Sequence, residues 1–258
     1  MGYIEKSFCL NEKVVAISGS AGFLCGEMAM GFHRAGCTVV ALDIDVEGSN
    51  LIIDKIKCEG GKAIALRLDV THKTDFESCL KDILNVYGKV DVLINGAGIN
   101  APTPFLDIGE DEWDRILAVQ LKGTMFGCQV FGQQMLDQGR GSIINISSAS
   151  AAPPLSKAFT YSVAKAGIKN LTQNLAREWA TEGVRVNALR PGFFPTEWSK
   201  ENFITEERKK AILSHTPMAR YGKPEELVGA VLWLASDAAS FVTGAEIAVD
   251  GGFSAMTV

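Results

Sequence analysis

The chain has 258 residues, of which 47% are hydrophobic and 21% charged, so it is typical of a folded globular protein and not of a disordered or fibrous one. Its formal net charge of −5 argues against a nucleic-acid-binding groove, which needs a basic face. No stretch is apolar enough to cross a bilayer, and the N-terminus lacks a signal-peptide pattern. We therefore expect a cytoplasmic protein that binds neither nucleic acid nor membrane.

The six cysteines are dispersed and form no Cys-x-x-Cys pair. The three histidines are far apart, and none stands at zinc-ligand spacing from a cysteine or carboxylate. We expect inert thiols and no metal site.

Apolar runs alternate with helical patterns along the chain. The runs that predict strands are 14–17, 38–42, 63–68, 90–94, 142–146, 184–189 and 246–249. The segments that predict helices are 24–35, 48–59, 74–87, 111–136, 158–181, 206–213 and 224–235. Most strands are almost continuously apolar, as are strands buried on both faces of a parallel sheet. The pattern predicts an α/β fold, a doubly wound parallel seven-stranded sheet of the Rossmann type, in one domain spanning 1–258.

Two of the predicted helices, 111–136 and 158–181, are apolar over much of their circumference. The residues that exceed a single stripe on the first are Leu117, Leu121, Met125, Phe126, Val130 and Phe131. Packing on the sheet explains one side of such a helix, and a second subunit could cover the other.

A glycine-rich turn follows the first predicted strand, with glycines at positions 19, 22 and 26. Such a turn, leading into a helix N-terminus, lets backbone N–H groups approach a pyrophosphate. The spacing is not G-x-G-x-x-G, and a plain tight turn is the alternative.

Asp43 ends the second predicted strand. A carboxylate there accepts hydrogen bonds from the adenosine ribose and repels a 2′-phosphate. Because no Arg or Lys stands in the glycine turn or directly after Asp43, we expect NAD to be preferred over NADP. The alternative is an aspartate that caps the next turn.

Tyr161 and Lys165 are four residues apart on a predicted helix and share a face. An ammonium beside a phenol lowers the pKa of the phenol, which would make Tyr161 a general acid–base. Ser148 follows the fifth strand and could hydrogen-bond a substrate carbonyl, although a turn serine is the simpler interpretation of that residue alone.

Three further segments complete a pattern: Asn95-Gly96-Ala97-Gly98 after the fourth strand, Pro191–Thr196 after the sixth, and Val249–Gly252 near the C-terminus. With these, the chain resembles the short-chain dehydrogenase/reductase family of the single-domain type, from about Lys13 to Gly252.

The resemblance implies a role for each matching residue. Tyr161 would move a proton to or from the substrate oxygen, Ser148 would hold that oxygen, and Lys165 would depress the tyrosine pKa and bind the nicotinamide ribose. The other implied cofactor contacts are Gly19, Gly22, Leu24, Asp43, Asp69, Val70, Asn95, Ala97, Gly98, Pro191, Gly192, Phe194 and Thr196. The implied substrate contacts are Ser148, Ser150, Tyr161 and Trp198. The family resemblance also implies a homotetramer.

The chain departs from the family pattern in two places. Phe23 and Cys25 stand where the glycine turn would have its later glycines, which puts the turn geometry in doubt. Gln120 replaces the family's helix asparagine, which holds a water in the proton relay; we expect Gln120 to take over that role.

A narrower resemblance is to the branch of fructuronate reductases and other sugar-acid reductases. It rests on Gly22–Cys25 and Arg190–Glu197. A lid over the substrate is expected around 194–215. Its cationic, amide and aromatic side chains would suit a sugar carboxylate, and a solvated amphipathic helix is the alternative. These side chains are Trp198, Lys200, Asn202, Arg208, Lys209 and Lys210.

The leading hypothesis is an NAD-dependent oxidoreductase that interconverts a secondary alcohol and a ketone on a polar small molecule, such as a sugar or sugar acid. A 3-oxoacyl- or steroid-type reductase is the alternative within the enzyme class. A catalytically idle nucleotide-binding sensor or scaffold is the alternative of another class.

Overall fold

Seven parallel strands form one sheet in a computed structural model, which describes residues 2–152, 155–196 and 204–256. The sheet order is β3-β2-β1-β4-β5-β6-β7. The strands are β1 (Val14–Ser18), β2 (Thr38–Asp43), β3 (Ala63–Arg67), β4 (Val92–Asn95), β5 (Gly141–Ile146), β6 (Val184–Pro191) and β7 (Glu246–Val249). The predicted doubly wound parallel sheet is confirmed.

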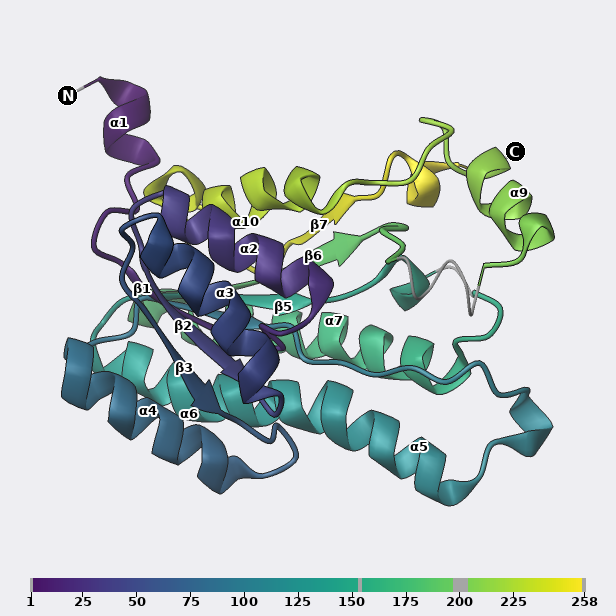
Figure 1. Cartoon of the computed structure of the whole chain (residues 1–258), viewed down its shortest axis with the longest axis horizontal. Helices are drawn as coiled ribbons and strands as arrows, with labels where there is room; N and C mark the ends of the chain where they lie inside the picture. Colours follow the sequence, from purple (N-terminus) through teal and green to yellow (C-terminus); the bar gives the residue numbers. More distant parts are fainter. Residues whose placement is uncertain (1, 153–154, 197–203, 257–258) are drawn as a thin grey trace.

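Helices cover both faces of this sheet (Figure 1). One face carries α2 (Phe23–Arg34), α3 (Val46–Cys58) and α10 (Val228–Ala235). The other carries α4 (Lys73–Tyr87), α6 (Gly123–Asp137) and α7 (Phe159–Trp179). Each face buries its own apolar cluster, which explains why the central strands are apolar on both sides. The shorter helices are α1 (Tyr3–Ser7), α5 (Glu110–Leu117) and α9 (Glu206–Ser214).

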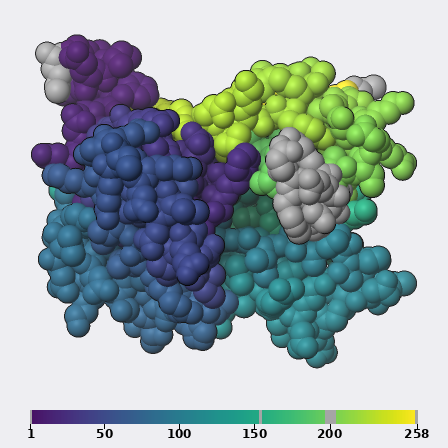
Figure 2. All heavy atoms as spheres, in the orientation of Figure 1, coloured from purple at the N-terminus to yellow at the C-terminus, as the bar shows by residue number. Residues whose placement is uncertain are grey.

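The strand order reverses between β1 and β4, which lie side by side although β2 and β3 come between them in the chain. Ligands of open α/β sheets bind outside the carboxyl ends of the strands at such a point. Figure 2 shows the surface hollowed between the purple and blue N-terminal part of the chain and the green part.

The predicted helix 111–136 is interrupted. A π-helical turn, Ala118–Lys122, separates α5 from α6. The hydroxyl of Thr124, at the start of α6, donates to the carbonyl of Gln120 in this turn at 2.7 Å. Turns of this kind are frequent at functional sites. Helix α1 was not predicted, because five mostly polar residues carry no helical period.

Most of the apolar side chains that exceed a single stripe on the predicted helix 111–136 fall into two groups, one buried in the core and one at the surface. Val130 and Phe131 are buried in the subunit core. Three others, with Leu171 of α7, line a surface groove of about 560 Å³ that has Asp114 and Lys122 among its lining residues. Those three are Leu117, Leu121 and Met125.

Within the described residues, no helix is long and apolar enough to span a membrane, and no three His, Cys, Asp or Glu side chains form a metal-binding group. All six cysteines are free, and four of them are buried.

Candidate functional site

The turn after β1 is built around Gly19, whose φ of +76° is strained for any other residue. A Cβ at Gly19 would also lie 2.6 Å from the backbone nitrogen of Ala97, which follows β4. The backbones of the two turns therefore touch at the point where the strand order reverses. Gly22 is the N-cap of α2, and no side chain caps that helix. This end of α2 fits the pyrophosphate of a dinucleotide.

The residues that depart from the family's glycine pattern do not disturb this turn. Phe23 begins α2 with its ring half exposed. Cys25 is buried, and its Sγ occupies the space beside Gly96, where a Cβ would lie only 2.3 Å away. Burial raises the pKa of the Cys25 thiol to about 12, against a weaker opposing effect of Lys165. Cys25 is thus a neutral packing group beneath the site.

Asp43 lies at the edge of the same turn. Its carboxylate accepts hydrogen bonds from the backbone N–H groups of Ala21 and Asp45, both at 3.0 Å. Arg67 is its partner in the register of β2 and β3, and the Arg67 guanidinium lies 3.4 Å from Asp75. Sequence reasoning missed this cation, because 24 positions separate it from Asp43 in the chain.

Asp69 and Val70 follow β3 at the same edge of the sheet. The Asp69 carboxylate accepts hydrogen bonds from the backbone and hydroxyl of Thr71, at 3.0 and 2.6 Å, and these bonds lower its pKa. Val70 is buried against Gly123 of α6.

Ser148, Tyr161 and Lys165 come together where β5 ends and α7 begins. Ser148 is extended and accepts hydrogen bonds from the backbone and hydroxyl of Ser150, at 3.2 and 3.1 Å. Lys165 is buried, donates to the carbonyl of Ile146 at 2.6 Å, and lies 5.3 Å from the centre of the Tyr161 ring. The helix spacing and the strand end therefore place the three predicted groups in one site.

The expected lowering of the tyrosine pKa is wrong for the chain alone. Burial raises the pKa of Tyr161, and a hydrogen bond with Ser148 opposes that rise only in part. Burial also lowers the pKa of Lys165 to about 8, because its ammonium has lost most of its solvation. The phenol remains protonated near neutrality, and the lysine titrates close to it.

Gln120 is fully buried in the π-helical turn. Its Nε2 donates to the carbonyl of Ile99 at 2.7 Å, and a Cβ on Gly98 would lie only 2.8 Å from its Oε1. The Oε1 atom has no hydrogen-bond partner in the described part of the chain. Gln120 therefore holds the segment that follows β4 through its Nε2, and its Oε1 is available as a buried hydrogen-bond acceptor.

Asn95 is directed into the core. Its Nδ2 donates to Asn145 at 2.9 Å, and Asn145 donates to the hydroxyl of Thr172 on α7 at 3.0 Å. The Asn95 side chain thus ties β4 to β5 and α7, and the residues after it, Ala97 and Gly98, are nearer the surface.

The segment after β6 packs against the end of β7. The Gly192 N–H donates to the Val249 carbonyl at 3.0 Å, and a Cβ on Gly192 would lie 2.6 Å from the Cα of Asp250. The ring of Phe194 lies against Gly222. Pro191 is buried, and Thr196 is half buried.

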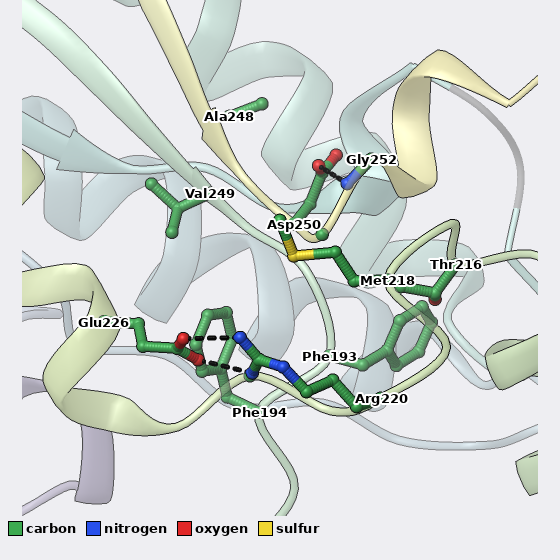
Figure 3. Close-up of a pocket in the computed structure, with 12 residues that line it drawn as sticks. Phe193, Phe194, Thr216, Met218, Arg220, Glu226, Ala248, Val249, Asp250 and Gly252 are labelled. Carbon is green, nitrogen blue, oxygen red and sulfur yellow. Dashed lines mark hydrogen bonds and ion pairs between the residues drawn. The ribbon is translucent and has the colours of Figure 1, made fainter.

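A pocket of about 420 Å³ borders this segment, lined by Phe193, Phe194, Met218 and the ends of β7 (Figure 3). Arg220 and Glu226 form a two-bond ion pair beside the Phe194 ring. Ser148, Tyr161 and Lys165 are not among the described residues that line it.

The expected lid is described only in part. Trp198, Lys200 and Asn202 lie outside the described residues. Within α9, Arg208 donates to the carbonyl and hydroxyl of Ser156, at 3.0 and 3.2 Å. Because Ser156 precedes α7 by three residues, Arg208 joins α9 to the loop that leads to Tyr161.

Comparisons with known proteins agree with this geometry. Residues 23–254 match a family model described as enoyl-(acyl carrier protein) reductase. The uncharacterised oxidoreductase UxuB of Bacillus subtilis is 38% identical, over 95% of this chain and 96% of its own.

Two similar solved structures contain a bound nicotinamide cofactor. A candidate NAD(P)-dependent gluconate 5-dehydrogenase from Beutenbergia cavernae, with bound NADP, is 33% identical over 97% of this chain and all of its own, with a TM-score of 0.92. A candidate D-mannonate oxidoreductase from Haemophilus influenza, with bound NAD, is 34% identical over 96% and 97%, with a TM-score of 0.90.

Proposed function

Because this chain belongs to the short-chain dehydrogenase/reductase family, we propose that it interconverts a secondary alcohol and a ketone on a sugar or sugar acid, with NAD as cofactor. The observation that carries the proposal is the meeting of Ser148, Tyr161 and Lys165 at the carboxyl ends of the strands. The glycine turn and the uncapped start of α2 lie at the same edge of the sheet.

Each of the three groups has a distinct task in this reaction. When bound, the nicotinamide supplies or accepts the hydride. The Tyr161 hydroxyl gives a proton to the carbonyl oxygen in reduction and takes one from the alcohol in oxidation. The Ser148 hydroxyl holds the same substrate oxygen. The Lys165 ammonium, fixed on the Ile146 carbonyl, stabilises the phenolate that forms on Tyr161.

The remaining site residues bind the cofactor in this proposal. Gly19 and Gly22 admit the pyrophosphate, and the N-terminus of α2, with Leu24 in its first turn, faces the anion. The segments after β3, β4 and β6 border the rest of the dinucleotide. The residues assigned to them are Asp69, Val70, Ala97, Gly98, Gly192, Phe194 and Thr196. Asn95 and Pro191, also implied by the resemblance, are the last residues of β4 and β6, and the Asn95 side chain is directed into the core, so we assign both to the support of these segments.

The preference for NAD rests on Asp43. Its carboxylate is fixed by two backbone N–H groups, so it cannot easily turn away from a 2′-phosphate. Juxtaposed like charges in a binding site can cost several kcal/mol. The neighbouring Arg67 is engaged with Asp75.

We predict that Asp43→Ala narrows the difference between the dissociation constants of NAD and NADP, because the repulsion is removed while Arg67 remains. Isothermal titration of both cofactors measures this. Asp45→Ala is the matched control, since it removes a neighbouring carboxylate at the N-cap of α3 and should not improve NADP binding. Tighter binding of NADP than of NAD by the parent protein would refute the preference.

The substrate class is supported by the basic lid and by the relatives. Arg208 is held beside the loop that leads to Tyr161, where a sugar carboxylate could reach it. The similar proteins described above include a candidate gluconate 5-dehydrogenase and a candidate D-mannonate oxidoreductase. We propose Ser150 and Trp198 as further substrate contacts.

The proposal also covers the oligomeric state of the protein and its compartment in the cell. We propose that the chain self-associates through the apolar groove of α5, α6 and α7, and the family resemblance supplies the proposed size, a homotetramer. Six free cysteines fit the reducing cytoplasm.

A substrate panel tests the function. Polyols, ketoses and sugar acids are supplied with NAD or NADH, and 3-oxoacyl thioesters with NADPH, while NADH or NADPH absorbance is followed. The proposal predicts turnover with a sugar or sugar acid. Turnover confined to acyl thioesters would favour the alternative reductase, and cofactor binding without any turnover would favour an idle sensor.

A further inference from the structure

Four polar side chains meet on the α7 side of the sheet. Ser147 directly follows β5, Arg190 is near the carboxyl end of β6, Glu246 is the first residue of β7, and Lys169 lies on α7. Glu246 accepts hydrogen bonds from the hydroxyl of Ser147 at 2.7 Å and from Arg190 at 3.0 Å. The ammonium of Lys169 lies 3.5 Å from the same carboxylate. We refer to these four residues as the Glu246 cluster.

Each partner of Glu246 is next to a group of the proposed site. Ser147 directly precedes Ser148, and Arg190 directly precedes the Pro191–Thr196 segment. Lys169 is one helical turn beyond Lys165 on α7, on the same face. One carboxylate therefore connects the three elements that carry the serine, the lysine and the cofactor segment.

The cluster also reaches the C-terminal segment. Arg190 donates to the hydroxyl of Ser254 at 2.9 Å. The Asp250 carboxylate in turn accepts the backbone N–H groups of Gly252 and Ser254, at 2.9 and 3.0 Å. The chain that follows β7 is thus fixed to the same arginine.

The placement of this charge is specific. The Glu246 side chain is only 9% exposed, and carboxylates are rarely buried so far unless they are paired. On this side of the sheet Ile143 of β5 and Val186 of β6 are apolar, and Asn145 of β5 is polar but uncharged. Ser147 and Arg190 lie at the carboxyl ends of β5 and β6, where the proposed chemistry takes place, and Glu246 reaches them from the start of β7.

We propose that Glu246 is a positioning residue, which holds Ser148, Lys165 and the Pro191–Thr196 segment in register through Ser147, Lys169 and Arg190. This inference rests on the proposed function, since it assigns no chemistry to Glu246 itself. Displacements near 1 Å of a group close to a reaction can cost up to about 10²-fold in rate.

The experiment uses Glu246→Gln, Ser147→Ala and the double variant. Glu246→Gln keeps the size and an acceptor but removes the charge, and Ser147→Ala removes one hydrogen bond without touching any charge. Glu59→Gln is the control, because it weakens a two-bond pair with Arg34 far from the site, at 2.8 and 3.1 Å. We measure kcat and KM on the best substrate of the panel, NADH affinity by fluorescence, and hydrogen exchange by mass spectrometry.

The expected result is a kcat lowered about threefold to tenfold in each single variant, with NADH affinity within about twofold of the parent. The double variant should be no slower than Glu246→Gln, since both changes break the same link. Amide exchange should rise in 147–152 and 190–196 and not elsewhere. Glu59→Gln should match the parent in all readouts.

Two outcomes would overturn the proposal. One is parent-like kcat and exchange in Ser147→Ala and Glu246→Gln. The other is a uniform rise of exchange over the whole chain, as a merely structural ion pair would produce. Hydrogen exchange needs no turnover, so a failure of the proposed function in the substrate panel leaves this test decisive.

Discussion

At the scale of single residues, the chemistry depends on two groups whose burial moves their protonation in opposite directions. Burial raises the pKa of Tyr161, because a buried phenolate is poorly solvated, so the phenol stays protonated. Burial lowers the pKa of Lys165 to about 8, because a buried ammonium is poorly solvated too. A protonated phenol near neutrality suits the role of acid in ketone reduction. The ammonium of Lys165 is then the group whose charge decides the rate.

We predict that kcat for ketone reduction falls as pH rises through about 8, where Lys165 loses its proton. The sign follows from the lowered pKa: the amine is charged below about 8 and neutral above, and only the charged form stabilises the phenolate that forms on Tyr161. Initial rates of NADH oxidation, measured with saturating ketone from below to above pH 8, show whether kcat decreases in this way.

Lys165→Arg is the control for this decrease of kcat with pH, because a guanidinium keeps its charge at every pH tested. Its residual rate should show no decrease near the same pH. A parent enzyme whose reduction rate is flat through that range would show that Lys165 is not the titrating group.

At the scale of elements, the π-helical turn between α5 and α6 supports the segment that follows β4 in the site. It places Gln120 against Gly98 and brings its Nε2 to the Ile99 carbonyl. The family pattern leads us to expect a role in the proton relay for this residue. The orphaned Oε1 is compatible with that role, and the bond to Ile99 adds a structural one.

Substitution separates these two roles of Gln120. We predict that Gln120→Leu slows turnover while NAD affinity stays nearly unchanged, and that Gln120→Asn stays within about an order of magnitude of the parent. Gln120→Leu should also cost about 1–3 kcal/mol of stability, because the Ile99 carbonyl loses its donor. Turnover and the solvent isotope effect of both variants test this. A Gln120→Leu enzyme equal to the parent in both would make the residue purely structural.

The elements themselves were largely predictable, and the contacts between distant ones were not. Continuous apolar runs revealed all seven strands, because burial on both faces leaves a strong local signal. The π-helical turn has no such signal, since it adds one residue to an unbroken helical pattern. Sheet register places Arg67 beside Asp43, and Ser147 and Arg190 beside the Glu246 carboxylate, and a single sequence does not display that register.

At the scale of the whole molecule, a surface remains that one subunit does not cover. The groove of Leu117, Leu121, Met125 and Leu171 is apolar, and it lies on the helices that also carry Gln120, Tyr161 and Lys165. Contiguous apolar surface of this kind marks an interaction site. Association through it would stiffen the helices beneath the site.

We predict that Met125→Glu shifts the protein towards smaller species, because a charge in the groove opposes its burial against a second copy. Sedimentation velocity at micromolar concentration measures the change. Leu51→Glu is the matched control, since Leu51 is exposed on α3, on the other face of the sheet. A parent protein that sediments as a monomer would contradict the proposed assembly.

The proton transfer at Tyr161 is tested most directly by Tyr161→Phe, which removes only the hydroxyl. Turnover on the best sugar or sugar acid, followed by NADH absorbance, should fall about 10²–10⁴-fold, the usual value of general acid–base catalysis. NADH affinity and the unfolding temperature should stay close to those of the parent. A Tyr161→Phe enzyme that retains near-normal turnover would contradict the proposed reaction.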